Sequence, residues 1–99
     1  MKDFVYYNDL FSIYSPLLTD NEKNSFKEHY FEDLSLSEIA EEKNISRAAV
    51  HKTVSNVIDK LNYYESILHV HDNMKKLKEC LELNDVSLIK EKINEIIEK

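Results

Sequence analysis

The 99-residue sequence contains no glycine, a single proline (Pro16) and a single cysteine (Cys80). The lack of glycine argues against a β-sheet fold, because tight hairpin turns rely on glycine or Asn-Gly pairs. A lone cysteine excludes an internal disulfide, which suits a reducing compartment. No apolar run has the length of a signal peptide or of a membrane span. We therefore expect an all-α protein of the cytoplasm that does not enter a membrane.

Basic side chains are also outnumbered. The sequence has 13 Lys and Arg against 19 Asp and Glu, which gives a net charge of −6. Phosphate neutralisation supplies much of the affinity of DNA-binding domains, so this balance argues against strong non-specific DNA binding. Residues 35–62 are the exception, with four basic and four acidic side chains. A phosphate backbone would be repelled least by this middle segment.

The sequence also lacks the patterns that carry catalysis or metal binding. There is no glycine-rich phosphate loop and no nucleophile elbow, so we expect no catalytic residue, no enzyme activity and no cofactor. His69, His71 and Cys80 are the only group that suggests a metal site. Two residues are about half a helical turn, so the two histidines would point apart, and we expect no metal site.

Helical spacing of apolar residues and helix-capping signals predict five helices, over about 3–15, 19–33, 35–43, 46–82 and 86–98. Pro16 ends the first, and the capping boxes Thr19-x-x-Glu22 and Ser35-x-x-Glu38 open the second and third. We expect one domain over 1–99, with a core at 1–62 and a C-terminal helical arm at 63–99.

The fourth predicted helix is unusually long. Its apolar seam follows a heptad-like 4-3-4-3-4 spacing from Val50 to Leu68, and then shifts register to start again from Ile67. We expect one continuous helix, in which the shift either changes the supercoiling locally or marks a bend, although Asp72-Asn73 could cap a fresh helix. A helix of about 37 residues spans roughly 55 Å and would project beyond its domain. A second protomer could cover the projecting part, which predicts a homodimer.

Residues 34–54 match a helix-turn-helix. Ala40 is small enough for the crossing of the two helices, and Asn44 tolerates the left-handed conformation of the turn. The apolar anchors would be Ile39, Ile45, Val50 and Val54. The second helix would then present polar residues of its first turns to nucleic acid.

The candidate nucleic-acid-binding residues are Ser46, Arg47, Ala48, His51, Lys52 and Ser55. Arg47 and Lys52 are the expected contacts to phosphate or guanine. Ser46 caps the helix, whose free N–H groups could meet a phosphate. Arg47 and Lys52 could equally be solvated surface charges.

Several motifs resemble the YlxM family and, more broadly, the region-4 helix-turn-helix of bacterial sigma factors. They are Leu18-Thr19, the aromatic pair Tyr30-Phe31, the run DLSLSEIAEE at 33–42, and Ile45-Ser46-Arg47-x-Ala49-Val50. The resemblance covers about residues 3–70. The family often has glutamine where this chain has Ala48, and basic residues where it has Ser55 and Asn56, which weakens the case for base-specific DNA contact.

The resemblance implies a non-enzymatic helper or regulator, because the family is associated through neighbouring genes with the signal recognition particle pathway. The partner would be DNA, the RNA of the particle, or its protein. Two alternatives stay open: a dimeric transcriptional regulator that reads duplex DNA, and a protein-interaction module whose helix-turn-helix is purely structural.

Overall fold

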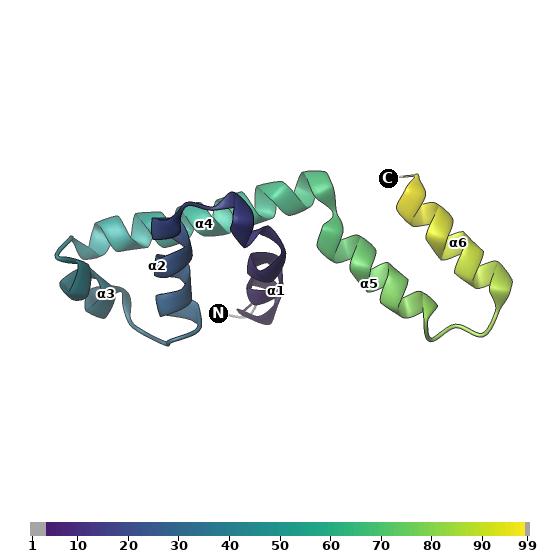
Figure 1. The fold of residues 1–99 in the computed structure, drawn as a ribbon, viewed down its shortest axis with the longest axis horizontal. Coiled ribbons are helices and arrows are strands. Elements are labelled where there is room, and N and C mark those ends of the chain that lie inside the picture. Colours follow the sequence, from purple (N-terminus) through teal and green to yellow (C-terminus); the bar gives the residue numbers. More distant parts are fainter. Residues whose placement is uncertain (1–3, 99) are drawn as a thin grey trace.

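The computed structural model describes residues 4–98, and in that range it contains helices and no strand (Figure 1). The elements are α1 (Phe4–Tyr14), the 3-10 helix η1 (Ser15–Leu17), α2 (Asp20–Tyr30), α3 (Leu36–Lys43), α4 (Arg47–Leu68), α5 (Val70–Cys80) and α6 (Val86–Ile97). The predicted all-α class is confirmed. None of the helices within residues 4–98 combines the length and the apolar character that crossing a bilayer requires.

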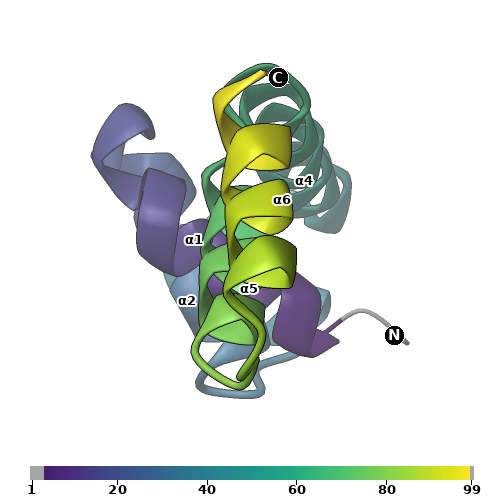
Figure 2. The ribbon, with the colours of Figure 1, turned by 90° about the vertical axis from the view of Figure 1, so that its right-hand side faces the viewer.

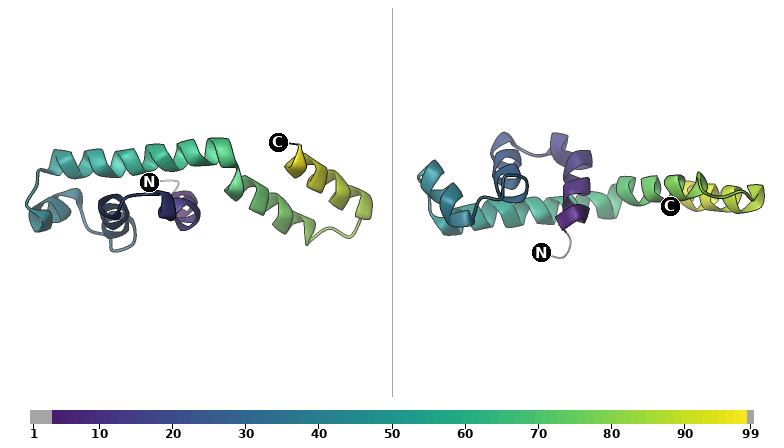
Figure 3. Two further views of the ribbon diagram at one scale, coloured as in Figure 1. Left: turned by 45° about the horizontal axis from the view of Figure 1, so that its top comes forward. Right: turned by 90° about the horizontal axis from the view of Figure 1, so that it is seen from below.

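The hydrophobic core lies where α1, α2 and α3 pack against α4 (Figures 1 and 3). Within residues 4–98, every buried hydrophobic side chain belongs to the segment from Leu10 to Leu61. An aromatic stack forms part of it. The fully buried ring of Phe26 lies 4.5 Å from the ring of Phe11 and 4.3 Å from that of Tyr30, nearly parallel to both.

Both predicted capping boxes are present. The Thr19 hydroxyl accepts a hydrogen bond from the N–H of Glu22 (3.2 Å), and the Glu22 carboxylate accepts one from the N–H of Thr19 (2.9 Å). Ser35 and Glu38 make the same reciprocal pair at the start of α3. These side chains satisfy N–H groups that a helix start leaves without partners, and so they define where α2 and α3 begin.

The continuous helix predicted over 46–82 is wrong, because the chain breaks at His69, between α4 and α5. His69 has a left-handed backbone, with φ 54° and ψ 27°, which histidine adopts more readily than most non-glycine residues. The alternative cap at Asp72-Asn73 is also misplaced, since α5 runs through both residues. Of the two readings of the register shift near Ile67, local supercoiling or a bend, the structure shows a change of direction, at the break between α4 and α5.

The buried carboxylate of Glu65 holds the joint between α4 and α5. It accepts hydrogen bonds from the Tyr14 hydroxyl (2.6 Å) and from the backbone N–H groups of His71 and Asp72 (3.0 Å each). The N–H of Val70 donates to the Tyr14 hydroxyl (3.3 Å). The first N–H groups of α5 therefore find acceptors on α1 and α4 instead of in a local cap.

Beyond the joint, α5 and α6 form an antiparallel hairpin, which we call the arm, directed away from the core (Figures 1 and 2). Neither helix of the arm has a buried residue. The described molecule measures 57 × 22 × 19 Å and has a radius of gyration of 17.4 Å, against about 13 Å for a compact domain of this size. The C-terminal helical extension therefore takes the form of a hairpin that starts at Val70, after the break.

Candidate nucleic-acid interface

Helices α3 and α4 form the helix-turn-helix, with a sharp turn between them. Asn44 ends α3 with φ 57° and ψ 45°, and the N–H of Ile45 donates to the Ala40 carbonyl (3.0 Å). That bond closes a Schellman-type cap, which needs a residue with positive φ. Ala40 is buried as predicted, so its small side chain sits in the packed interior.

Three of the four predicted anchors, Ile39, Val50 and Val54, are buried in the core. Ile45 is not, because 45% of its surface is exposed. The prediction that it anchors the turn is therefore wrong. The turn is held by its backbone hydrogen bonds, which leave Ile45 at the surface.

Asn44 provides a direct test of the turn. Replacing Asn44 by Ile should lower the free energy of unfolding by about 1–2 kcal/mol, because a β-branched side chain clashes with the backbone at positive φ. Asn44→Gly should stay within about 0.5 kcal/mol of the parent, since glycine adopts this conformation freely. Urea denaturation followed by circular dichroism measures both. Equal losses in the two variants would contradict a role for the left-handed backbone.

The N-terminus of α4 is capped and exposed. The Ser46 hydroxyl accepts from the N–H of Ala49 (3.0 Å). The N–H groups of Arg47 and Ala48 find no acceptor among residues 4–98. A helix start of this kind carries a partial positive charge and free donors, which favour an anion.

The structure places five of the six candidate residues at the surface of the first turns of α4: Ser46, Arg47, Ala48, His51 and Lys52. Arg47 and His51 lie one turn apart, and Ala48 and Lys52 form a neighbouring pair at the same spacing. Ser55 is half-buried and lines a shallow depression of about 270 Å³ together with Tyr30 and Leu36. It lies between this face and the core.

Ion pairs distinguish the four basic side chains of residues 35–62. Lys43 lies 3.5 Å from the Glu28 carboxylate, and Lys60 lies 2.7 Å from that of Glu22. Arg47 and Lys52 form no ion pair with any residue from 4 to 98. The helix-turn-helix therefore keeps two basic groups available to an external anion.

Glu22 serves both the cap of α2 and the ion pair with α4. Burial by itself raises the pKa of Glu22, but hydrogen bonds from Lys60 and Thr19 outweigh it and hold that pKa below its usual value. Glu42 on α3 shows the opposite behaviour, because hydrogen bonding to the Glu28 carboxyl and the charge of Glu28 raise its pKa. The acidic groups near Glu28 make α3 the less favourable side for a phosphate.

Within residues 4–98 no cluster of His, Cys, Asp and Glu could hold a metal ion. His69 occupies the break, and the ring of His71 packs edge-on against Tyr6 (5.1 Å between centroids) and lies 3.5 Å from the Asp9 carboxylate. Cys80 is half-buried on α5. These three residues therefore serve the joint and the arm.

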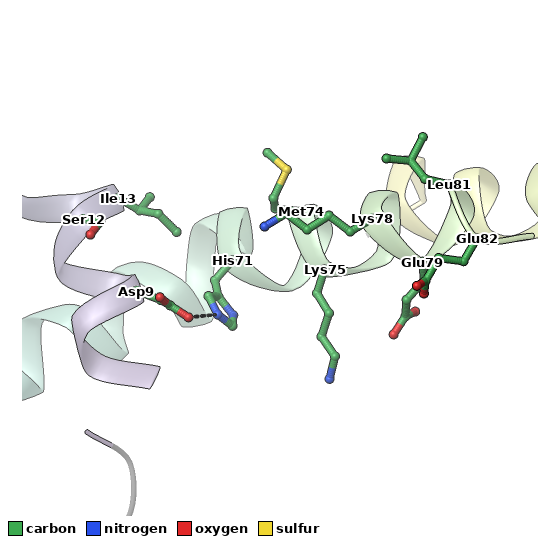
Figure 4. A pocket seen from close by; sticks show the side chains of 10 residues that line it. All are labelled: Asp9, Ser12, Ile13, His71, Met74, Lys75, Lys78, Glu79, Leu81 and Glu82. Atoms are coloured by element: carbon green, nitrogen blue, oxygen red, sulfur yellow. Dashed lines mark ion pairs between the residues drawn. The ribbon is translucent and has the colours of Figure 1, made fainter. Parts of the chain in front are cut away.

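A larger groove, of about 760 Å³, lies away from the helix-turn-helix, between α1 and α5 (Figure 4). Ile13 lines it from α1, and Met74 and Leu81 line it from the α5 side, with charged side chains around them. Sequence reasoning missed this groove, since it exists only because the break at His69 sets α5 beside α1.

The fold and the turn geometry together define an all-helical helix-turn-helix protein. All of residues 1–99 match the family described as "Putative helix-turn-helix protein, YlxM / p13 like". The chain belongs to this family, UPF0122, and the resemblance to YlxM noted in the sequence is confirmed.

Relatives in several bacteria are similar over most of their length. A UPF0122 protein of Fusobacterium nucleatum subsp. nucleatum is 35% identical over 99 residues, which cover 99% of this chain and 95% of the relative. One of Ureaplasma parvum serovar 3 is 43% identical over 82 residues, covering 82% and 83% of the two chains. One of Lactococcus lactis subsp. cremoris is 43% identical over 75 residues, covering 76% and 68%.

Proposed function

We propose that this chain is a non-catalytic regulator that binds nucleic acid through the first two turns of α4, and that it acts in the signal recognition particle pathway. The observation that carries the first part is the pair of unpartnered cations, Arg47 and Lys52, beside the free N–H groups at the start of α4. The helix-turn-helix family to which the chain belongs supports it.

The link to the signal recognition particle rests on the resemblance to the YlxM family. The RNA of the particle is the partner we favour over duplex DNA. Ala48 offers no hydrogen-bonding group to a base edge, and Ser55 is half-buried, so base readout by α4 is limited. Contacts to phosphates need neither group and suit an RNA recognised by its shape.

Fluorescence anisotropy with labelled signal-recognition-particle RNA and with duplex DNA, at low and physiological salt, tests this function. Arg47→Ala/Lys52→Ala should weaken RNA binding by about tenfold or more. It should also reduce the slope of log affinity against log salt by about two, one for each lost phosphate contact. Lys27→Ala is the control, because Lys27 is an exposed lysine of α2 without an ion pair among the described residues.

Binding that is unchanged in the double variant, or absent for both nucleic acids, would contradict this function. The helix-turn-helix would then be a scaffold for protein contacts, the alternative that the net charge of −6 favours. Binding of duplex DNA in preference to RNA would instead support a transcriptional regulator.

A dimeric reader of duplex DNA is the second candidate, and one observation favours it. The arm has no buried residue, yet it carries large apolar side chains, of which Met74, Leu77 and Ile93 are between 38% and 47% exposed. A surface of this kind is typical of a protein contact. The homodimer is therefore kept as part of the proposal.

A further inference from the structure

The sequence keeps one helical pattern across the position where the structure breaks the helix. Residues 46–82 contain neither glycine nor proline, the two residues that most often end a helix. Six apolar residues on the two sides of the break follow the 4-3-4-3-4 spacing of a single heptad-like seam, and all six side chains are exposed: Tyr63, Ile67, Val70, Met74, Leu77 and Leu81. This seam is continuous only if α4 and α5 form one helix.

The break itself rests on one residue with an unfavourable backbone. His69 has φ 54° and ψ 27°, between two regular helices. The left-handed conformation brings Cβ close to the following carbonyl oxygen, so every residue other than glycine is disfavoured in it to some degree. A right-handed His69 would remove this cost and would join α4 to α5. The local sequence therefore favours a continuous helix, and contacts from elsewhere in the chain must hold the break.

The hydrogen bonds at the break have a direct equivalent in a continuous helix. The first three N–H groups of α5 donate to the Tyr14 hydroxyl (3.3 Å) and to the two carboxylate oxygens of Glu65 (3.0 Å each). In a continuous helix they would donate to the carbonyls four positions back, those of residues 66–68. Among residues 4–98, no backbone N–H of α5 reaches these carbonyls. The break therefore exchanges three backbone hydrogen bonds for three bonds to side chains, and no donor is lost.

Contacts with α1 favour the bent arrangement, but they are small. The ring of His71 packs edge-on against Tyr6 (5.1 Å between centroids) and lies 3.5 Å from the carboxylate of Asp9, whose side chain is 55% exposed. Ion pairs as exposed as this one contribute little. No residue of α5 is buried, so the arm does not form a large interface with the core. The two arrangements are therefore closely balanced.

We propose that the joint between α4 and α5 is a hinge with two defined states. In the bent state, which the structure shows, His69 is left-handed and Glu65 caps α5. In the extended state His69 is right-handed, and residues 47–80 form one helix about 51 Å long. Glu65 decides between the two states, because it accepts from the N–H groups of α5 only in the bent one.

The two states present different surfaces. The groove of about 760 Å³ lies between α1 and α5, so it exists only in the bent state (Figure 4). The seam from Tyr63 to Leu81 is continuous only in the extended state. A backbone change at one residue therefore replaces one surface by another, as in other hinges, where a few residues absorb the change. The helix-turn-helix lies outside the moving part, so the hinge does not depend on nucleic-acid binding.

Double electron–electron resonance between two spin labels measures the direction of the arm. The labels are attached to Val5→Cys on α1 and Asn84→Cys at the tip of the arm, in a full-length chain that also carries Cys80→Ser. Val5 and Asn84 are exposed, and neither lines the groove. The bent state should give one distance between the labels. The extended state should give a longer one, because α5 then leaves α1.

Two variants that differ only at residue 69 test the hinge. Both carry Glu65→Gln, which weakens the cap of α5, and they add either His69→Leu or His69→Gly. Leucine favours the right-handed helix, whereas glycine adopts the left-handed conformation freely. The ratio of the longer to the shorter distance should therefore be at least about tenfold higher in the leucine version than in the glycine version.

We expect the shorter distance for the parent chain and a narrow peak at the longer distance for the leucine version. A narrow peak identifies a rigid continuous helix. A single broad distribution in the leucine version overturns the inference, because the joint is then only loosened. So does a leucine version without the longer distance, and so do leucine and glycine versions with the same distribution.

Far-UV circular dichroism checks that every labelled chain is helical. If Glu65→Gln removes the helices, His69→Leu and His69→Gly in the parent chain make the same comparison and are judged by the same outcomes. The experiment uses no nucleic acid, so its failure and a failure of the anisotropy experiment, which tests the first turns of α4, can be told apart.

Discussion

Replacing Glu65 by alanine is expected to lower the free energy of unfolding by about 3 kcal/mol, because hydrogen bonds to a charged acceptor contribute about 1.5–3 kcal/mol each and the cost of burying the carboxylate, which alanine does not carry, offsets part of their sum. The carboxylate accepts three, from the Tyr14 hydroxyl and from the N–H groups of His71 and Asp72. Its removal leaves a buried hydroxyl and the start of α5 without their acceptor. The α4–α5 joint then loses its fixed angle.

Urea denaturation at pH 7 measures the loss, and small-angle X-ray scattering detects the change of shape as a change in the radius of gyration. Glu65→Gln is the milder variant, since an amide oxygen still accepts from Tyr14. Tyr14→Phe removes the partner hydroxyl, and the double variant should lose less than the sum of the singles because the two groups act together. Strict additivity would show that they do not.

The same site makes stability depend on pH. Burial by itself raises the pKa of Glu65, but hydrogen bonds from Tyr14, His71 and Asp72 outweigh it and hold that pKa below its usual value. The contribution of Glu65 is therefore complete above the unfolded-state pKa of about 4.3 and is lost as the pH falls through the lower folded-state value. The difference in stability between the parent and Glu65→Gln should shrink over that range.

Burial also acts on the pKa of the neighbouring Tyr14 hydroxyl, and here it is not outweighed. Together with the hydrogen bond to Glu65, it raises the pKa of the Tyr14 hydroxyl to about 12. The hydroxyl therefore keeps its proton, and so its role as donor to Glu65, throughout the neutral and mildly alkaline range. No loss of stability from this group is expected between pH 7 and pH 9.

Phe26→Ala should have the largest effect on the core, a loss of about 3–5 kcal/mol. Its ring is fully buried and stacks on the rings of Phe11 and Tyr30, so truncation removes both contacts and leaves a cavity. A domain with a total stability of about 5–15 kcal/mol then becomes partly unfolded near 37 °C. Thermal unfolding followed by circular dichroism measures the shift.

Phe31→Ala is the matched control. Phe31 also contacts Phe11 and Phe26 edge-on, but half of its surface is exposed. Its truncation should cost about 1 kcal/mol, since half of its surface already faces water. Equal losses in the two variants would show that the aromatic stack is not central to the core.

Sequence reasoning succeeded wherever the determining contact is local. The hydroxyls of Thr19 and Ser35 accept hydrogen bonds from residues three positions further along the chain, and the left-handed conformation of Asn44 involves that residue alone. Short sequence patterns are therefore enough to recognise these features. The helix-turn-helix follows from them. Ser46 and Arg47, expected to be presented outward by the second helix, are exposed.

Sequence reasoning failed where the contacting residues are far apart in the chain. The break at His69 depends on the hydrogen bond between Tyr14 and Glu65, which are 51 positions apart. Nothing in the segment 65–72 alone predicts which acceptor will cap α5. The groove between α1 and α5 was missed for the same reason, and the ion pairs that leave Arg47 and Lys52 available also join different helices.

The joint at Glu65 also sets an order of events in folding. Helices form in about a microsecond from local contacts, whereas a contact across 51 positions must wait until the chain between them is arranged. The arm can therefore adopt its final direction only after α1 has docked on α4. A chain that has not yet built its core carries an arm with no preferred direction, so the orientation of the arm is itself a sign that α1 has docked on α4.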